Sequence, residues 1–104
     1  MISEQLIQQA VQRVVEVASP SRVIVFGSHA RGDAREGSDL DLLVVEPVVA
    51  NVGEEMMRLH KALWPLKIPV DILVCSESDF EKKRSWRSSA IYWANREGKV
   101  LYAA

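Results

Sequence analysis

The sequence is poor in cysteine, in net charge and in long apolar runs. A single cysteine among 104 residues cannot form an internal disulfide, so a disulfide-rich scaffold is excluded and a reducing compartment is expected. The formal net charge of -1 excludes the strongly basic surface of proteins that bind nucleic acid by general electrostatics. No apolar stretch approaches the roughly 20 residues that span a bilayer, and the first residues lack the charged and then apolar pattern of a signal peptide. We therefore expect a cytoplasmic protein that is not inserted in a membrane.

The remaining composition suits one ordinary globular domain. Hydrophobic residues make up 48% of the chain, and about 100 residues are enough to bury one core without disulfides or metals. The chain has no internal repeat, low-complexity tract or convincing linker. Residues 1–104 are therefore expected to form a single domain.

Helical periodicity is clear in the first two thirds of the chain. Apolar residues recur every three or four positions in residues 6–18 and again in 52–63, which is typical of amphipathic helices with one buried stripe. Ser3 can cap the first helix. Asn51 and Glu54 have the spacing of a capping box and predict the start of the second.

The last third of the chain carries another capping-box signal. Ser78 and Glu81 predict the start of a further helical region, which ends at Gly98 after a break near Ser85. β-Branched and apolar runs, bounded by turn residues, predict short strands between the helices. These strands cover residues 22–26, 39–45, 70–74 and 99–102.

The order of these elements predicts an α/β or α+β fold, in which helices cover a sheet of about three to four strands. The ten-residue link between Gly27 and Gly37 is short for a parallel crossover, which usually takes about a dozen residues or more. The first two strands are therefore expected to be antiparallel and the sheet mixed.

Acidic residues interrupt two of the apolar strands. Asp39 and Asp41 are two positions apart, so both side chains leave the same face of the predicted strand. Asp71 stands alone in the apolar segment 68–74. Like charges in apolar surroundings are costly unless a positive group compensates them, and oxygen ligands suit a hard divalent cation. If the two strands are neighbours, three carboxylates can form a two-metal site for phosphoryl transfer.

The segment after the first strand can bind phosphate. Gly27 and Ser28 stand between that strand and a predicted helix start, where free N–H groups attract anions and a glycine allows close approach. Arg31, one turn later, can reach the same phosphates or pair with Asp33 on the surface. Ser38 can add a hydroxyl from the far side of the loop.

Together, these motifs resemble the minimal nucleotidyltransferases of the DNA polymerase beta superfamily. The resemblance covers about the whole chain and implies the palm-like nucleotidyltransferase fold of that superfamily. The segments that carry it are Gly27-Ser28-His29-Ala30-Arg31-Gly32, Gly37-Ser38-Asp39-Leu40-Asp41-Leu42, Val70-Asp71-Ile72 and the ending Arg96-Glu97-Gly98-Lys99-Val100-Leu101-Tyr102.

The resemblance also implies roles for individual residues. Asp39 and Asp41 would ligate two divalent cations, Mg²⁺ or Mn²⁺. Asp71 would complete the site of one cation and orient or deprotonate an acceptor hydroxyl. Gly27 and Ser28 would hold the triphosphate of ATP or another NTP.

The activity implied is transfer of a nucleoside monophosphate, AMP foremost, to a hydroxyl with release of pyrophosphate. Stand-alone proteins of this kind resemble the transferase half of two-component bacterial systems whose other half is a helical HEPN protein. The resemblance implies an antitoxin that adenylylates a tyrosine of that partner. A non-catalytic antitoxin that acts by contact and a small-molecule nucleotidyltransferase remain alternatives. Intact carboxylates disfavour the first, and the absence of additional helical domains disfavours the second.

Other conspicuous side chains receive no catalytic role. His29 and His60 are expected to be solvated or structural, and Cys75 is expected in the core. The tryptophans are expected in the core or in contacts of a homodimer or hetero-complex.

Overall fold

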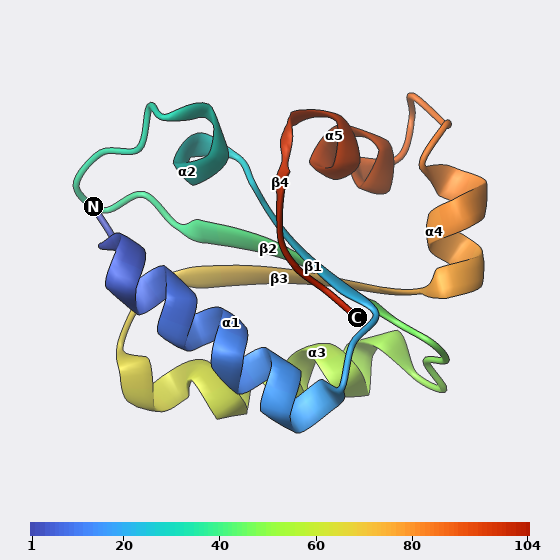
Figure 1. Ribbon diagram of the computed structural model, residues 1–104, viewed down its shortest axis with the longest axis horizontal. Helices are drawn as coiled ribbons and strands as arrows, with labels where there is room; N and C mark the ends of the chain where they lie inside the picture. The colour runs from blue at the N-terminus through green and yellow to red at the C-terminus, as the bar shows by residue number, and fades with distance from the viewer.

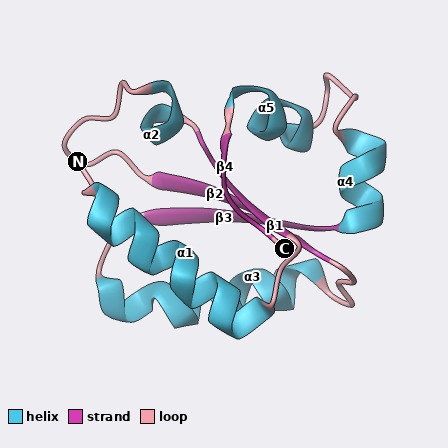
Figure 2. Ribbon diagram, in the orientation of Figure 1, coloured by secondary structure: helices cyan, strands magenta, loops and turns pink.

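The computed structural model describes residues 1–104, and its helices lie on both faces of one sheet (Figures 1 and 2). The helices and strands follow the alternation predicted from the sequence. In chain order they are α1 (Glu4–Ala18), β1 (Arg22–Phe26), α2 (Ser28–Arg31), β2 (Leu40–Glu46), α3 (Val52–Leu63), the 3-10 turn η1 (Trp64–Leu66), β3 (Val70–Ser76), α4 (Glu77–Lys83), α5 (Ala90–Glu97) and β4 (Lys99–Ala103).

The sheet has the strand order β3-β2-β1-β4. β1 pairs antiparallel with β2 and with β4, whereas β2 pairs parallel with β3. The mixed sheet, the antiparallel first pair and the final edge strand are therefore confirmed. The parallel pair forms because α3 and η1 supply the long crossover that the short link after β1 cannot.

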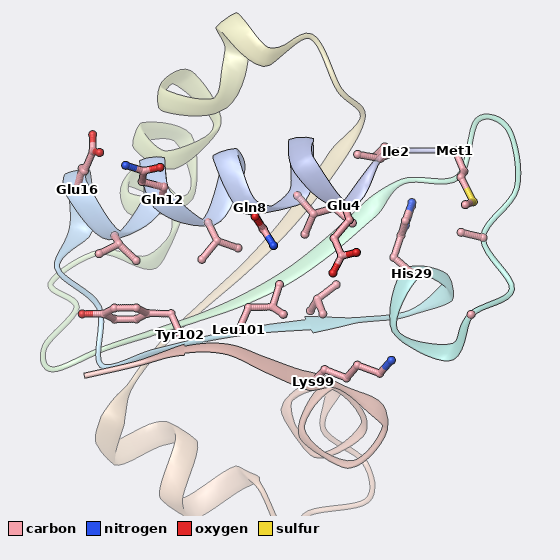
Figure 3. A pocket seen from close by; sticks show the side chains of 16 residues that line it. Met1, Ile2, Glu4, Gln8, Gln12, Glu16, His29, Lys99, Leu101 and Tyr102 are labelled. Atoms are coloured by element: carbon pink, nitrogen blue, oxygen red, sulfur yellow. The ribbon is translucent and has the colours of Figure 1, made fainter.

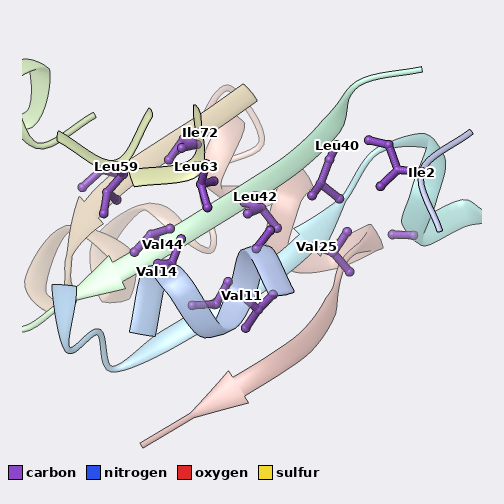
Figure 4. Close-up of a cluster of buried hydrophobic side chains, with 14 residues drawn as sticks. Ile2, Val11, Val14, Val25, Leu40, Leu42, Val44, Leu59, Leu63 and Ile72 are labelled. Atoms are coloured by element: carbon purple, nitrogen blue, oxygen red, sulfur yellow. The ribbon is translucent and has the colours of Figure 1, made fainter. Parts of the chain in front are cut away.

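Strand β2 is central and buried on both faces. Leu40, Leu42 and Val44 point toward α1 and α3, where they join a cluster of 14 buried residues (Figure 4). Leu43 and Val45 belong to a smaller cluster under α4 and α5. Two covered faces explain why this strand is an almost continuous apolar run. Helix α1 lies over the larger cluster through its buried Ala10, Val11 and Val14.

Side-chain caps fix the predicted helix starts, with one correction. The hydroxyl of Ser3 and the amide oxygen of Asn51 accept hydrogen bonds from backbone N–H groups at the starts of α1 and α3, as predicted. The prediction of Ser78 as the cap of α4 is wrong. β3 continues to Ser76 and the helix follows at once, so Ser76 accepts the 3.1 Å hydrogen bond from the N–H of Asp79.

Two further predictions need correction. Asp39 was predicted inside the strand but lies one residue before β2. Pairing with β3 begins at Leu40, and β1 turns away after Phe26, so neither neighbour offers Asp39 a partner. Of the two places expected for the tryptophans, the core is wrong and contacts of a homodimer or hetero-complex stay a prediction. Trp64, Trp86 and Trp93 are 80%, 53% and 50% exposed, respectively.

The break predicted near Ser85 is confirmed, because α4 and α5 are separate helices. Cys75 is buried, as expected. None of the helices has both the length and the apolar content needed to cross a bilayer.

A buried acid at the end of β2 is a feature that the sequence analysis missed. Glu46 is only 6% exposed, and its Oε2 has no hydrogen-bond partner. Burial is the main cause that raises the pKa of Glu46 to about 7, and the neighbouring Glu55 adds to the shift while Arg58 opposes it. The carboxylate of Glu55 is itself held by Arg58 at 2.7 Å. The neutral form of Glu46 is therefore favoured by the fold.

Glu46→Gln is expected to remove part of the pH dependence of stability. In the unfolded chain this group titrates near 4.5, so stability is unaffected below that pH and falls as the pH rises from 4.5 to about 7. Above pH 7 the variant should gain about 1 to 2 kcal/mol of unfolding free energy. Urea unfolding at pH 5 and pH 8 measures this gain. Glu16→Gln, an exposed change on α1, is the control, and an equal pH dependence in wild type and Glu46→Gln would contradict the interpretation.

Candidate active site

The sheet brings Asp41 and Asp71 side by side. They are Cα partners in the parallel pair β2–β3, so their side chains leave the same face from strands about 4.8 Å apart. Asp39 stands two residues before Asp41, immediately ahead of β2, and its negative charge acts on Asp41 as well. The two acidic strands are neighbours, which was the condition for three carboxylates to share one site.

Asp41 occupies the most crowded position of the three. Burial raises the pKa of its carboxyl group, and the negative charges of Asp71 and then Asp39 raise it further. The positive charges of His29 and Arg31 oppose the shift. Such crowding is relieved by a cation placed between the carboxylates.

The donor atoms fit a hard divalent cation, because all three predicted ligands are carboxylates and two of them stand in register. Asp39 and Asp71 are exposed and therefore open to an ion from solvent. No three histidine, cysteine or acidic side chains are grouped closely enough in this structure to hold one ion. The ligand set therefore stays a prediction.

Gly27 packs directly on Asp41. Its φ of +72° is rarely adopted by other residues. A Cβ at this position would overlap Oδ2 of Asp41 and would lie 3.1 Å from its Cγ. The glycine is thus required twice, by the backbone turn and by the space that the carboxylate fills. The glycine–serine turn and the acidic group consequently form one continuous site.

The short helix α2 is anchored beside the acids. Ser28 is its first residue, and Gly32 ends it with a φ of +85°. Nδ1 of His29 lies 3.1 Å from the backbone oxygen of Asp39, which links the helix to the start of β2. The hydroxyl of Ser38 accepts a 2.8 Å hydrogen bond from the N–H of Arg35 and so closes the loop between them.

Arg31 makes the surface pair with Asp33 that was one of its two expected roles, and it also contacts Glu97. Its role as a phosphate ligand stays a prediction. Its Nε lies 3.3 Å from Oδ2 of Asp33, and its Nη1 lies 3.3 Å from Oε1 of Glu97. The N–H of Gly27 donates to the same Oε1 at 3.2 Å. Sequence reasoning did not identify Glu97 as a neighbour of Gly27 and Arg31. The available signal was the Glu97-Gly98 pair in the ending that carried the resemblance.

A separate pocket of about 900 Å³ lies between α1 and β4 (Figure 3). Its floor includes Val25 and Tyr102, and His29 reaches its edge. None of the predicted site residues lines it. Val25 belongs to the cluster on the α1 side of the sheet, whereas Asp41 alternates with Leu40 and Leu42 and points the other way. The acidic group is therefore a different site.

The family of the chain follows from comparison with known proteins. A model of the nucleotidyltransferase domain matches residues 5–93, which include the glycine–serine turn and all three acids. The chain belongs to this family. The predicted resemblance and the assignment as a nucleotidyltransferase enzyme are confirmed. A protein of Methanocaldococcus jannaschii, provisionally named a protein adenylyltransferase, is 36% identical to this nucleotidyltransferase over 83 residues, which cover 78% of this chain and 77% of that one.

Solved structures share the fold. One is the crystal structure of a Sulfolobus solfataricus protein that is provisionally named a nucleotidyltransferase. It has a TM-score of 0.65 and 25% identity, over 95% of this chain and 78% of that one. A toxin-antitoxin crystal structure with AMP-PNP has a TM-score of 0.62 and 20% identity, over 93% of this chain and 73% of that one. The mixed sheet covered by helices is thus the nucleotidyltransferase fold.

Proposed function

We propose that this nucleotidyltransferase transfers AMP from ATP to a tyrosine hydroxyl of a helical HEPN toxin and so acts as its antitoxin. The observation that carries the proposal is the register of Asp41 and Asp71 beside the Gly27 turn. The adenylyltransferase name of the archaeal relative supports AMP transfer to a protein. The toxin-antitoxin structure of the same fold supports the biological role.

The chemistry assigns a task to each part of the site. The acceptor oxygen forms a bond to the α-phosphorus of ATP, the bond from that phosphorus to the bridging oxygen breaks, and pyrophosphate leaves. Asp71 orients the acceptor hydroxyl and takes its proton. Asp39 and Asp41 would hold divalent cations, Mg²⁺ or Mn²⁺, which supply charge neutralisation for the triphosphate and the leaving group.

The phosphate groups lie on the other side of Asp41. The backbone of Gly27, the hydroxyl of Ser28 and the guanidinium of Arg31 bind the triphosphate from α2. Ser38 keeps its O–H free to donate, because its oxygen is the acceptor in the loop hydrogen bond. The order of the groups along the site is thus acceptor, acids and triphosphate.

Asp71→Asn is expected to suppress almost all labelling of the partner. The assay mixes labelled ATP and magnesium with a helical HEPN toxin, and mass spectrometry locates AMP on a tyrosine. Loss of a general base reduces transfer by about 10² to 10⁴-fold. Asp79→Asn removes a carboxylate beyond the opposite end of β3 and should label like wild type.

Masking of the toxin without any label would reject the enzymatic mechanism and establish an antitoxin that acts by contact. Labelling of a small molecule in place of the protein would establish the other alternative, a small-molecule nucleotidyltransferase.

A further inference from the structure

The carboxylate of Glu97 contacts two groups, on Gly27 and Arg31, that bind the triphosphate in the proposed function. Both of its oxygens contact Nη1 of Arg31, at 3.3 and 3.4 Å. One of them also accepts the N–H of Gly27 at 3.2 Å. A backbone N–H together with a guanidinium is a combination that binds a phosphate oxygen. The Glu97 carboxylate thus lies where a phosphate group of the proposed ligand would bind.

The fold fixes Glu97 at this place. It is the last residue of α5, and the next residue, Gly98, lies against the backbone of β1. A Cβ on Gly98 would overlap the carbonyl oxygen of Ala94 and a methyl group of Ile24, and would lie 2.8 Å from the carbonyl oxygen of Val25. The end of α5 therefore sits as close to β1 as a glycine allows. This contact aims Glu97 at the turn that directly follows the strand.

The ion pair between Arg31 and Glu97 is weak enough for another anion to displace Glu97. The side chains of Arg31 and Glu97 are 47% and 32% exposed, and an ion pair that solvent reaches contributes little free energy. A polyphosphate carries more charge than one carboxylate and can displace it from Arg31. Asp33 contacts a different nitrogen of the same guanidinium, so Arg31 stays anchored when Glu97 leaves.

We propose that Glu97 is an internal competitor for the phosphates and thereby sets the affinity of the site for polyphosphate ligands. The inference rests on the proposed function for the identity of the natural ligand. If Glu97 instead positioned Arg31 for phosphate, loss of its charge would change the affinity for polyphosphate in the opposite direction. Removing the charge of a competitor tightens binding, whereas removing a support weakens it.

Glu97→Gln separates the two roles. Glutamine keeps an oxygen that accepts the N–H of Gly27, so the turn retains its hydrogen bond while the negative charge is lost. The variant is expected to bind both tripolyphosphate without metal and magnesium with ATP about two- to fivefold more tightly than wild type. NMR shifts of the Gly27 amide and the Arg31 Nε–H group follow the first titration, and calorimetry follows the second.

Two further variants complete the design. Glu81→Gln breaks an ion pair with Arg84 of the same 3.3 Å length on α4 and makes the same change in net charge, so it should leave both affinities unchanged. In an Arg31→Gln background, Glu97→Gln should lose most of its effect, because the shared guanidinium is gone.

The outcomes distinguish this inference from the proposed function. Equal or weaker tripolyphosphate binding by Glu97→Gln overturns the inference, as does the absence of any shift at Gly27 and Arg31 in either protein. Tighter tripolyphosphate binding by the variant without any binding of magnesium and ATP upholds Glu97 as a competitor and overturns the proposed function.

Discussion

Replacing Asp39 and Asp41 together by asparagine is expected to abolish the stabilisation of the fold by magnesium and ATP. A ligand at 100 times its dissociation constant stabilises the native state by about 2.7 kcal/mol. Both carboxylates belong to the proposed cation site, and amides cannot neutralise a divalent ion. The measurement is the shift of thermal unfolding when magnesium and ATP are added. AMP transfer should be lost in parallel.

The ligand-free double variant should unfold at the same temperature as wild type or higher. Asp41 is crowded by Asp71 and Asp39, and burial adds to the cost of its charge, so removing two charges relieves repulsion. Asp79→Asn with Glu81→Gln removes the same number of charges from α4 and should keep the full ligand shift. An equal shift in the Asp39 and Asp41 variant would move the cation site away from these residues.

Gly27→Ala is expected to reduce AMP transfer by about 100-fold or more. The new methyl group would occupy the space of the Asp41 carboxylate, and displacement of a catalytic group by about 1 Å can cost about 10²-fold. The backbone of Gly27, with φ +72° and ψ −153°, lies in a region that is essentially open to glycine alone, which adds strain of about 1 to 3 kcal/mol. Transfer rate and unfolding free energy are measured on the same preparations.

Gly32→Ala is the matched control. Gly32 has a φ of +85° and no heavy atom within 4 Å of an added Cβ, so its substitution brings backbone strain without contact with the acids. Gly32→Ala should lose stability from backbone strain alone, and Gly27→Ala should lose more because its methyl group also overlaps Asp41. Only Gly27→Ala should lose most of its activity. If both alanine variants transferred AMP equally well, the close packing of Gly27 on Asp41 would have no catalytic consequence.

The local sequence determined most of the secondary structure. Periodicity and capping residues are properties of neighbouring positions, so α1 and α3 were predicted together with their Ser3 and Asn51 caps. The short link after Gly27 also predicted the antiparallel pair β1–β2, because chain length limits how far a connection can cross. The ends of helices and strands were predicted less accurately, because the start of β2 and the cap of α4 depend on which residues a neighbouring strand reaches.

For the candidate site, too, the residue types could be predicted from the sequence but their spatial arrangement could not. The sequence by itself predicted the acids and the glycine–serine turn as site residues, since charges in apolar strands and a glycine before a helix are visible in one dimension. It could not show that Asp41 lies in register with Asp71, because strand register is fixed by packing across the sheet. Glu97 and Gly27 are 70 residues apart along the chain, and only the approach of α5 to β1 brings them together. Long-range contacts of this kind are decided by tertiary packing, as is the burial that raises the pKa of Glu46.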